Sequence, residues 1–119
     1  MVIILGVEPT LDQARGVMAV RLSGDVDLAS VPQLRSALFD IDQRGHHRIE
    51  LDLRLVDFID SSGIGALLGA LRRARIAGGD LRIVAAAAPV STVLGVLGLS
   101  TVFGMGTDPD AAPSVEQEK

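Results

Sequence analysis

Hydrophobic and polar positions alternate strictly in one segment of the chain, from Arg48 to Arg54. Ile49, Leu51 and Leu53 fall on one side of an extended chain, and the charged residues between them fall on the other. This pattern is typical of a strand with one buried face and one exposed face. Weaker patterns predict an edge strand at 1–7, further strands at 16–22 and 81–87, and a last short strand at 101–103, with a turn at 8–13.

Apolar residues recur at helical spacing in three other segments. The first segment is expected to begin at the N-cap Ser30 and to end at Gly45, the second runs from Ser61 to Gly78-Gly79, and the third runs from Pro89 to Gly98. Their apolar stripes are Val31, Leu34, Leu38 and Ile41; Ile64, Leu67, Leu68 and Leu71; and Val90, Val93, Leu94 and Leu97.

The expected order of elements is strand-strand-helix-strand-helix-strand-helix-strand. Strand–helix–strand units connect parallel strands through right-handed crossovers. Because the strand at 48–54 has a polar face, helices should pack mainly on one face of the sheet. The predicted fold class is α/β, with a small, mostly parallel sheet of about four to five strands. Residues 1–107 are expected to form one domain, and the polar, proline-containing residues 108–119 a loose tail.

Composition narrows the classes of function. The chain has 119 residues and a formal net charge of -4, which argues against a nucleic-acid partner held by a general basic field. Cysteine is absent, so disulfides, thiol nucleophiles and cysteine-based metal sites are excluded. We expect no metal and no other cofactor. The apolar run at 1–5 is too short for a signal peptide or a membrane span, so the cytoplasm is the expected location.

The tetrapeptide Asp60-Ser61-Ser62-Gly63 carries the strongest chemical signal. It stands where a strand passes into a helix, and a helix start presents unpaired N–H groups that favour a phosphate. The serines are therefore candidate phosphoacceptors. The same residues also suit an ordinary helix cap, and the two interpretations are compatible.

Small residues continue this signal into the helix. Ser62, Gly65, Ala66 and Gly69 share one face, and glycine inside a helix is costly. A smooth face of this kind allows another protein to approach closely. The alternative is tight packing against the sheet, and the sequence leaves both open.

Asp25 and Asp27 follow the strand that should neighbour the one leading to Asp60. Parallel strands open on the same edge of a sheet, so these carboxylates are expected near Ser61. They are candidates for a recognition edge, for a metal or acid–base site, or for solvation and capping of the next helix. A serine hydrolase is disfavoured, because His46 and His47 precede the strand and should lie at its opposite end.

A known family shows the same motifs. The segments Leu22-Ser-Gly-Asp-Val-Asp27, Val56-Asp-Phe-Ile59, Asp60-Ser-Ser-Gly-Ile-Gly65 and Val96-Leu-Gly-Leu-Ser-Thr-Val-Phe103, with the Gly78-Gly79 break, together resemble STAS-domain anti-sigma factor antagonists. The resemblance covers about residues 15 to 104. It implies the STAS (SpoIIAA-like) fold.

The resemblance also implies a switch. In that family an anti-sigma factor that is also a serine kinase phosphorylates the serine after the aspartate, here Ser61. The unphosphorylated form binds the anti-sigma factor and releases a sigma factor, and a PP2C-type phosphatase reverses the modification. Asp27 and Asp60 match positions beside the phosphoserine. Family members usually end in a packed helix, whereas Pro109 and Pro113 interrupt the corresponding region here.

The expected function is therefore that of a non-enzymatic, phosphorylation-controlled binding protein. The expected partner-binding residues are Asp25, Asp27, Asp60, Ser61, Ser62, Gly63, Gly65, Ala66 and Gly69. Two alternatives remain. One is a STAS module that serves as a transporter subunit or signalling scaffold. The other is a nucleotide-binding protein that uses the same sheet edge, although Gly63 to Leu68 lacks the third glycine of a dinucleotide fingerprint.

Overall fold

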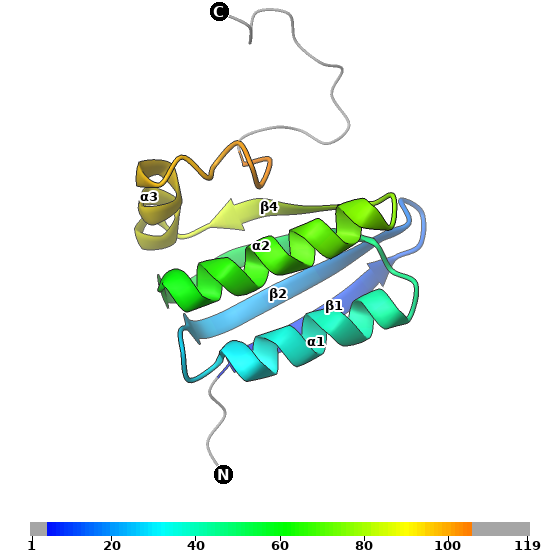
Figure 1. Ribbon diagram of the computed structural model, residues 1–119, viewed down its shortest axis with the longest axis horizontal. Coiled ribbons are helices and arrows are strands. Elements are labelled where there is room, and N and C mark those ends of the chain that lie inside the picture. Colours follow the sequence, from blue (N-terminus) through cyan, green and yellow to red (C-terminus); the bar gives the residue numbers. More distant parts are fainter. Residues whose placement is uncertain (1–4, 106–119) are drawn as a thin grey trace, which may run out of the picture.

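The computed structural model describes residues 5–105. Two predictions therefore concern residues outside the described range, namely the start of the edge strand at 1–4 and the tail at 108–119. The elements follow in the order β1 (Leu5–Asp12), β2 (Val17–Val26), α1 (Val31–Gln43), β3 (Arg48–Ile59), α2 (Ser61–Ile76), β4 (Asp80–Ala86) and α3 (Ala88–Val96), as Figure 1 shows.

The four strands form one sheet in the order β1-β2-β3-β4. β1 and β2 pair in antiparallel orientation as a hairpin, whereas β2, β3 and β4 are parallel neighbours. α1 and α2 lie side by side over one face of the sheet, and α3 lies at its end, beyond β4 (Figure 1). The α/β prediction of a small, mostly parallel sheet with helices mainly on one face is confirmed.

The core lies between this sheet face and the two helices. Alternating residues of β3 are buried, and Leu51 and Leu53 are completely inaccessible to solvent. The predicted stripe of α1 is buried throughout, and in α2 only Leu68 is left partly exposed. In α3, Val90 and Leu94 are buried. Val93 and Leu97 of the predicted α3 stripe are exposed instead, because this short helix covers only the end of the sheet.

The structure corrects two predicted elements. Residues 8–12, predicted as part of a turn, belong to β1, which extends to Asp12. Pro9 is tolerated there because an edge strand need not donate every N–H group. Residues 101–103, predicted as a strand, form turns. Phe103 nevertheless anchors this segment, since its side chain is fully buried and its carbonyl accepts a hydrogen bond from the Ile83 N–H.

β3 is longer than its alternating pattern indicates. It runs to Ile59, whereas its pairing with β4 ends at Leu53 opposite Ala86. Pairing with β2 continues to Val26 opposite Ile59. The end of β3 is therefore held mainly by β2, and the chain enters α2 beside the loop that joins β2 to α1. This arrangement brings the two predicted recognition segments together.

Candidate functional site

Asp60 joins the start of α2 to the β2–α1 loop. It is the N-cap of α2, and its Oδ1 accepts hydrogen bonds from the Gly63 N–H at 3.0 Å and the Ser62 hydroxyl at 2.6 Å. Its Oδ2 accepts the Leu28 N–H at 3.2 Å, and its own N–H donates to the Val26 carbonyl at 3.1 Å. One residue thus fixes two loops that are more than thirty positions apart in the sequence.

These hydrogen bonds also fix the charge of Asp60. The hydrogen bond from Ser62 is the largest cause of a lowered pKa, and the N–H groups of Gly63 and Leu28 lower the pKa further. Each donor stabilises the carboxylate more than the neutral acid. Asp60 is therefore ionised at neutral pH, and its negative charge stands at the positive end of the α2 dipole.

We predict an acid-dependent loosening of this loop junction. Because the pKa of Asp60 is lower in the folded than in the unfolded state, its ionised form stabilises the fold above its unfolded pKa of about 3.9, and this contribution disappears as the pH falls through the folded pKa. Urea unfolding of the wild type and Asp60→Asn, measured at neutral pH and near pH 3, checks this. The wild-type advantage should shrink in acid, and an advantage that is constant over this range would contradict the assignment.

The two serines occupy different environments. The Ser62 side chain is half-buried and its hydroxyl is committed to Asp60. Ser61, the first residue of α2, is exposed, and within the described part of the chain its hydroxyl forms no hydrogen bond. Of these two serines, Ser61 is the one whose hydroxyl an enzyme can reach without first breaking a contact.

The β2–α1 loop is held by Asp27 and Ser30. The Oδ1 of Asp27 accepts the N–H groups of Ala29 and Ser30, both at 3.1 Å, so Asp27 organises the start of α1. Ser30 stands at the predicted N-cap position, but its side chain makes no cap hydrogen bond. It is fully buried, and its hydroxyl donates to the Asp25 carbonyl at 2.7 Å and accepts from the Asp27 N–H. The Asp25 side chain is exposed at the end of β2.

The small residues of α2 divide into two groups. Ala66, one of the four residues of the predicted smooth face, is buried, so for this residue the alternative of tight packing holds. Gly63, which was expected among the partner-binding residues, is buried as well. A Cβ on Gly63 would lie 2.5 Å from the Val26 carbonyl oxygen, which shows that Gly63 lets α2 pack closely against β2. Gly65 is exposed with open space around it, and Gly69 is partly exposed. These two remain available to a partner.

Two apolar residues near Ser61 were not among the sequence candidates. Leu28 is 75% exposed although its backbone is held by Asp60, and Phe58, which pairs with Asp25 across the β2–β3 register, is 51% exposed. Large apolar side chains that are exposed beside a polar site are typical of protein interfaces. The sequence alone gives only a weak indication that these two residues are exposed, because each is an isolated apolar residue in a loop or at the end of a strand.

The structure separates the histidines from this site. His47 precedes β3 and pairs with Asp42 at 2.9 Å, whereas Ser61 lies beyond the other end of this twelve-residue strand, after Asp60. Neither histidine can therefore act as a base for Ser61. Within residues 5–105, no three acidic or histidine side chains gather in a metal-binding arrangement. No helix in the same range is long and apolar enough to span a membrane.

The chain is similar to known proteins in both sequence and structure. The family model described as "Mlab, STAS domain" matches residues 10–106. An anti-sigma F factor antagonist from Paenibacillus polymyxa is 32% identical over 94 residues, which cover 78% of this chain and 80% of that protein. An anti-sigma-B factor antagonist from Staphylococcus epidermidis is 28% identical over 84 residues, covering 71% and 78%.

Solved structures show the same likeness. The anti-sigma factor antagonist SpoIIAA in its unphosphorylated form superimposes with a TM-score of 0.70 and 25% identity, covering 87% of this chain and 90% of that one. The phosphorylated form of SpoIIAA from Bacillus superimposes with a TM-score of 0.65 at 22% identity, covering 96% and 100%. The fold is therefore found in both states of that protein.

Proposed function

Because this chain belongs to the STAS domain family, we propose that it is an anti-sigma factor antagonist whose binding is switched by phosphorylation of Ser61. In the unphosphorylated form it binds an anti-sigma factor, and this releases the sigma factor. The anti-sigma factor acts as the serine kinase, and a PP2C-type phosphatase removes the phosphate. The chain itself acts as a regulatory binding protein and not as an enzyme.

The difference between Ser61 and Ser62 is the observation that carries this proposal. Ser61 offers an exposed hydroxyl at the first position of a sixteen-residue helix, whereas the Ser62 hydroxyl is bound by Asp60. A phosphate on Ser61 stands on an exposed side chain at the positive end of the α2 dipole, so the domain can carry it without unfolding. The modified group then projects from the surface that a partner contacts.

The proposed partner surface surrounds Ser61. Asp25 and Asp27 contribute charge, and Gly65 and Gly69 allow close approach along α2. Leu28 contributes exposed apolar area, which commonly supplies the central contacts of an interface. Asp60 and Ser62 support this surface from within, because their polar atoms are bonded to each other and to the two loops.

The kinase reaction is the direct test of the proposed switch. Incubation with the cognate anti-sigma factor and ATP should raise the intact mass of the protein by one phosphate. Ser62→Ala should still be modified, because the acceptor hydroxyl is that of Ser61, and Ser61→Ala should not. A mass increase in Ser61→Ala equal to that of the wild type would overturn the assignment of Ser61.

A STAS module with another task is the second candidate. The description of the matching family model, "Mlab, STAS domain", does not name an anti-sigma factor antagonist. The match therefore also fits a STAS module that serves as a subunit of a transporter or scaffold. The two functions predict different partners. Affinity capture from the source cells with Ser61→Ala as bait should retain an anti-sigma factor, whereas recovery of transporter subunits in its place would favour the second candidate.

A further inference from the structure

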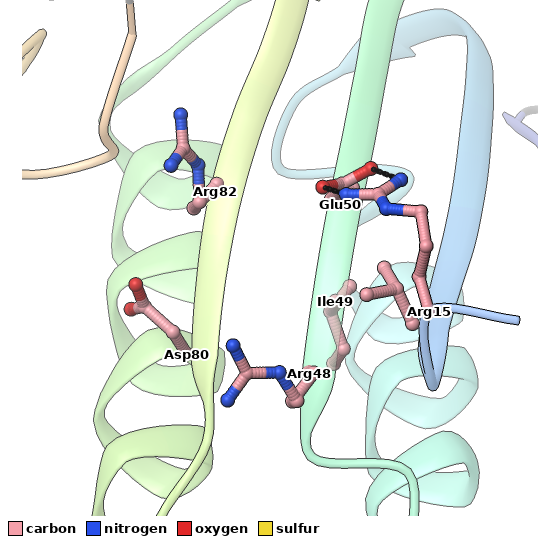
Figure 2. Close-up of a pocket in the computed structure, with 7 residues that line it drawn as sticks. Arg15, Arg48, Ile49, Glu50, Asp80 and Arg82 are labelled. Atoms are coloured by element: carbon pink, nitrogen blue, oxygen red, sulfur yellow. Dashed lines mark hydrogen bonds and ion pairs between the residues drawn. The ribbon is translucent and has the colours of Figure 1, made fainter. Parts of the chain in front are cut away.

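Arginine side chains gather around a cavity at the end of the sheet opposite Ser61. Arg15 comes from the turn between β1 and β2, Arg48 is the first residue of β3, and Arg82 comes from β4. With Glu50 and Asp80 they line a cavity of 380 Å³, shown in Figure 2. The protein as a whole carries a formal net charge of -4, so overall composition does not account for this local excess of cations.

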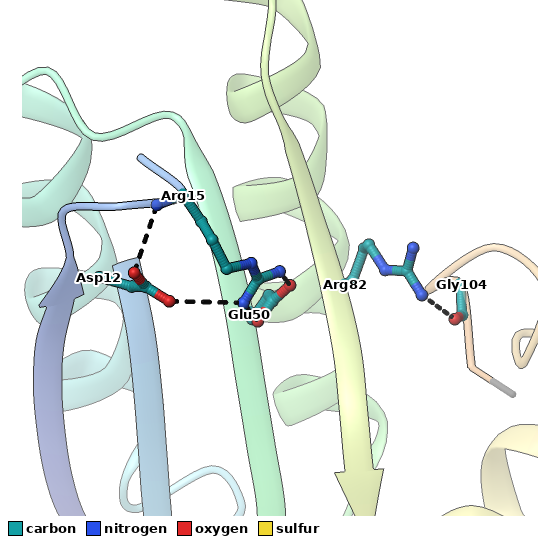
Figure 3. A network of polar contacts seen from close by, with 5 residues as sticks. All are labelled: Asp12, Arg15, Glu50, Arg82 and Gly104. Atoms are coloured by element: carbon teal, nitrogen blue, oxygen red, sulfur yellow. Dashed lines mark hydrogen bonds and ion pairs between the residues drawn. The ribbon is translucent and has the colours of Figure 1, made fainter. Parts of the chain in front are cut away.

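Both carboxylates of the cavity are already engaged. Glu50 accepts two hydrogen bonds from Arg15, from Nη1 at 3.1 Å and from Nη2 at 2.5 Å, and Figure 3 shows this forked pair. The Oδ1 of Asp80 accepts from the Arg75 Nε at 3.2 Å and from the Leu81 N–H at 2.9 Å. Each carboxylate is thus paired with another group and does not neutralise Arg48.

Arg48 supplies the uncompensated charge. Its side chain is exposed and extends toward β4, and among residues 5–105 it forms neither a hydrogen bond nor an ion pair (Figure 2). Arg82 is held in place, because its Nη2 donates to the Gly104 carbonyl at 2.9 Å (Figure 3). The register between β3 and β4 sets the spacing of these charged residues, since Arg48 stands opposite Asp80 and Glu50 stands opposite Arg82.

We propose that this cavity binds the phosphate group of a small anionic ligand, such as a diphosphate or a phosphate ester. A guanidinium presents parallel N–H donors that match phosphate oxygens in pairs, and Arg48 has all of its donors available for this. The cavity volume falls in the usual range for small-molecule sites, about 300–1,000 Å³. The twelve residues of β3 separate the site from Ser61 by roughly 40 Å, so the ligand and a partner at Ser61 can be bound at once.

NMR titration of the full chain with inorganic diphosphate, at constant ionic strength, tests this proposal. Saturable shifts are expected in the amide signals of residues 48–50 and 80–82 and not in those of residues 60–63. Arg48→Gln should weaken binding by at least about tenfold, which corresponds to the loss of one charge-assisted hydrogen bond. The substitution is on an exposed side chain, and the unchanged remainder of the spectrum will report that the variant is folded.

Arg35→Gln is the matched control. Arg35 is also an exposed arginine, but it lies on α1 on the other side of the sheet. Its substitution should leave the affinity unchanged, and Ser61→Ala should do the same. The proposal is overturned by shifts that do not saturate, by equal affinity in Arg48→Gln and the wild type, or by equal losses in Arg48→Gln and Arg35→Gln, because the last result indicates only a general charge effect.

Discussion

A phosphate on Ser61 is expected to weaken binding to the anti-sigma factor by about 100-fold or more, which requires a free-energy difference of only about 2.7 kcal/mol. The modification adds a charge of about -1.5 to -2 at neutral pH. Burying this hydrated group at the centre of an interface is costly, and the ionised carboxylate of Asp60 precedes it directly in the chain. The affinities of the phosphorylated and unphosphorylated protein, measured by calorimetry, give this ratio.

Two variants separate the effect of charge from the loss of the hydroxyl. Ser61→Ala should bind the anti-sigma factor about as tightly as the unphosphorylated wild type, and Ser61→Glu should bind more weakly than Ser61→Ala. Thermal unfolding of both variants serves as the control, since an exposed first helical residue should affect stability little. If the phosphorylated protein binds as tightly as the unphosphorylated one, then the charge does not act as a switch.

Gly79→Ala is expected to be among the most destabilising single substitutions in the domain. A Cβ at position 79 would lie 1.9 Å from the carbonyl oxygen of His47 and 2.5 Å from its carbonyl carbon. These are backbone atoms that precede β3, and the same carbonyl accepts the Asp80 N–H at the start of β4. The clash therefore separates the central strand β3 from the edge strand β4 at their first residues. We expect a loss of about 3 kcal/mol, the upper range for overpacking, measured by urea unfolding.

Gly65→Ala provides the matched control for this substitution. Gly65 lies inside α2, and a Cβ there would meet no atom within 4 Å. Alanine should therefore stabilise the helix by about 0.5–1 kcal/mol. The same chemical change should thus have opposite signs at the two glycines. A Gly79→Ala protein as stable as the wild type would mean that the strands shift to accept the extra methyl group at no cost.

The strands of the sheet could be predicted where buried and exposed residues alternate regularly along the chain. Ile49, Leu51 and Leu53 alternate because one face of β3 is covered by helices. Beyond Arg54 the alternation fails, because Leu55 is exposed and Val56 is buried at an irregularity in the β2–β3 register. The extension of β3 to Ile59 was missed for this reason. β1 was misplaced because its second half is an exposed edge strand, which needs no hydrophobic pattern.

The site was predictable in its parts but not in its internal contacts. Sequence placed Asp60, Ser61 and Asp27 at one edge, and strand pairing of Val26 with Ile59 accounts for their proximity. The local residues alone did not show which serine is the acceptor, and Ser61 was chosen only through the family resemblance, because the difference depends on the hydrogen bond that binds the Ser62 hydroxyl to Asp60. The burial of Gly63 and Ala66 was also hidden, since small residues suit an exposed smooth face and a tight interior contact equally well.

The bonds of Asp60 to Val26 and Leu28 lead us to expect that the proposed recognition surface forms late in folding. They join segments that meet only when β2 and β3 have paired and α1 has closed the connection between them. Contacts between such distant residues form slowly compared with local ones. A nascent or partly unfolded chain should therefore contain the proposed phosphoacceptor sequence but not the surface. We expect a kinase that reads this surface to modify only folded molecules, so that its rate of phosphate incorporation would report the folded fraction.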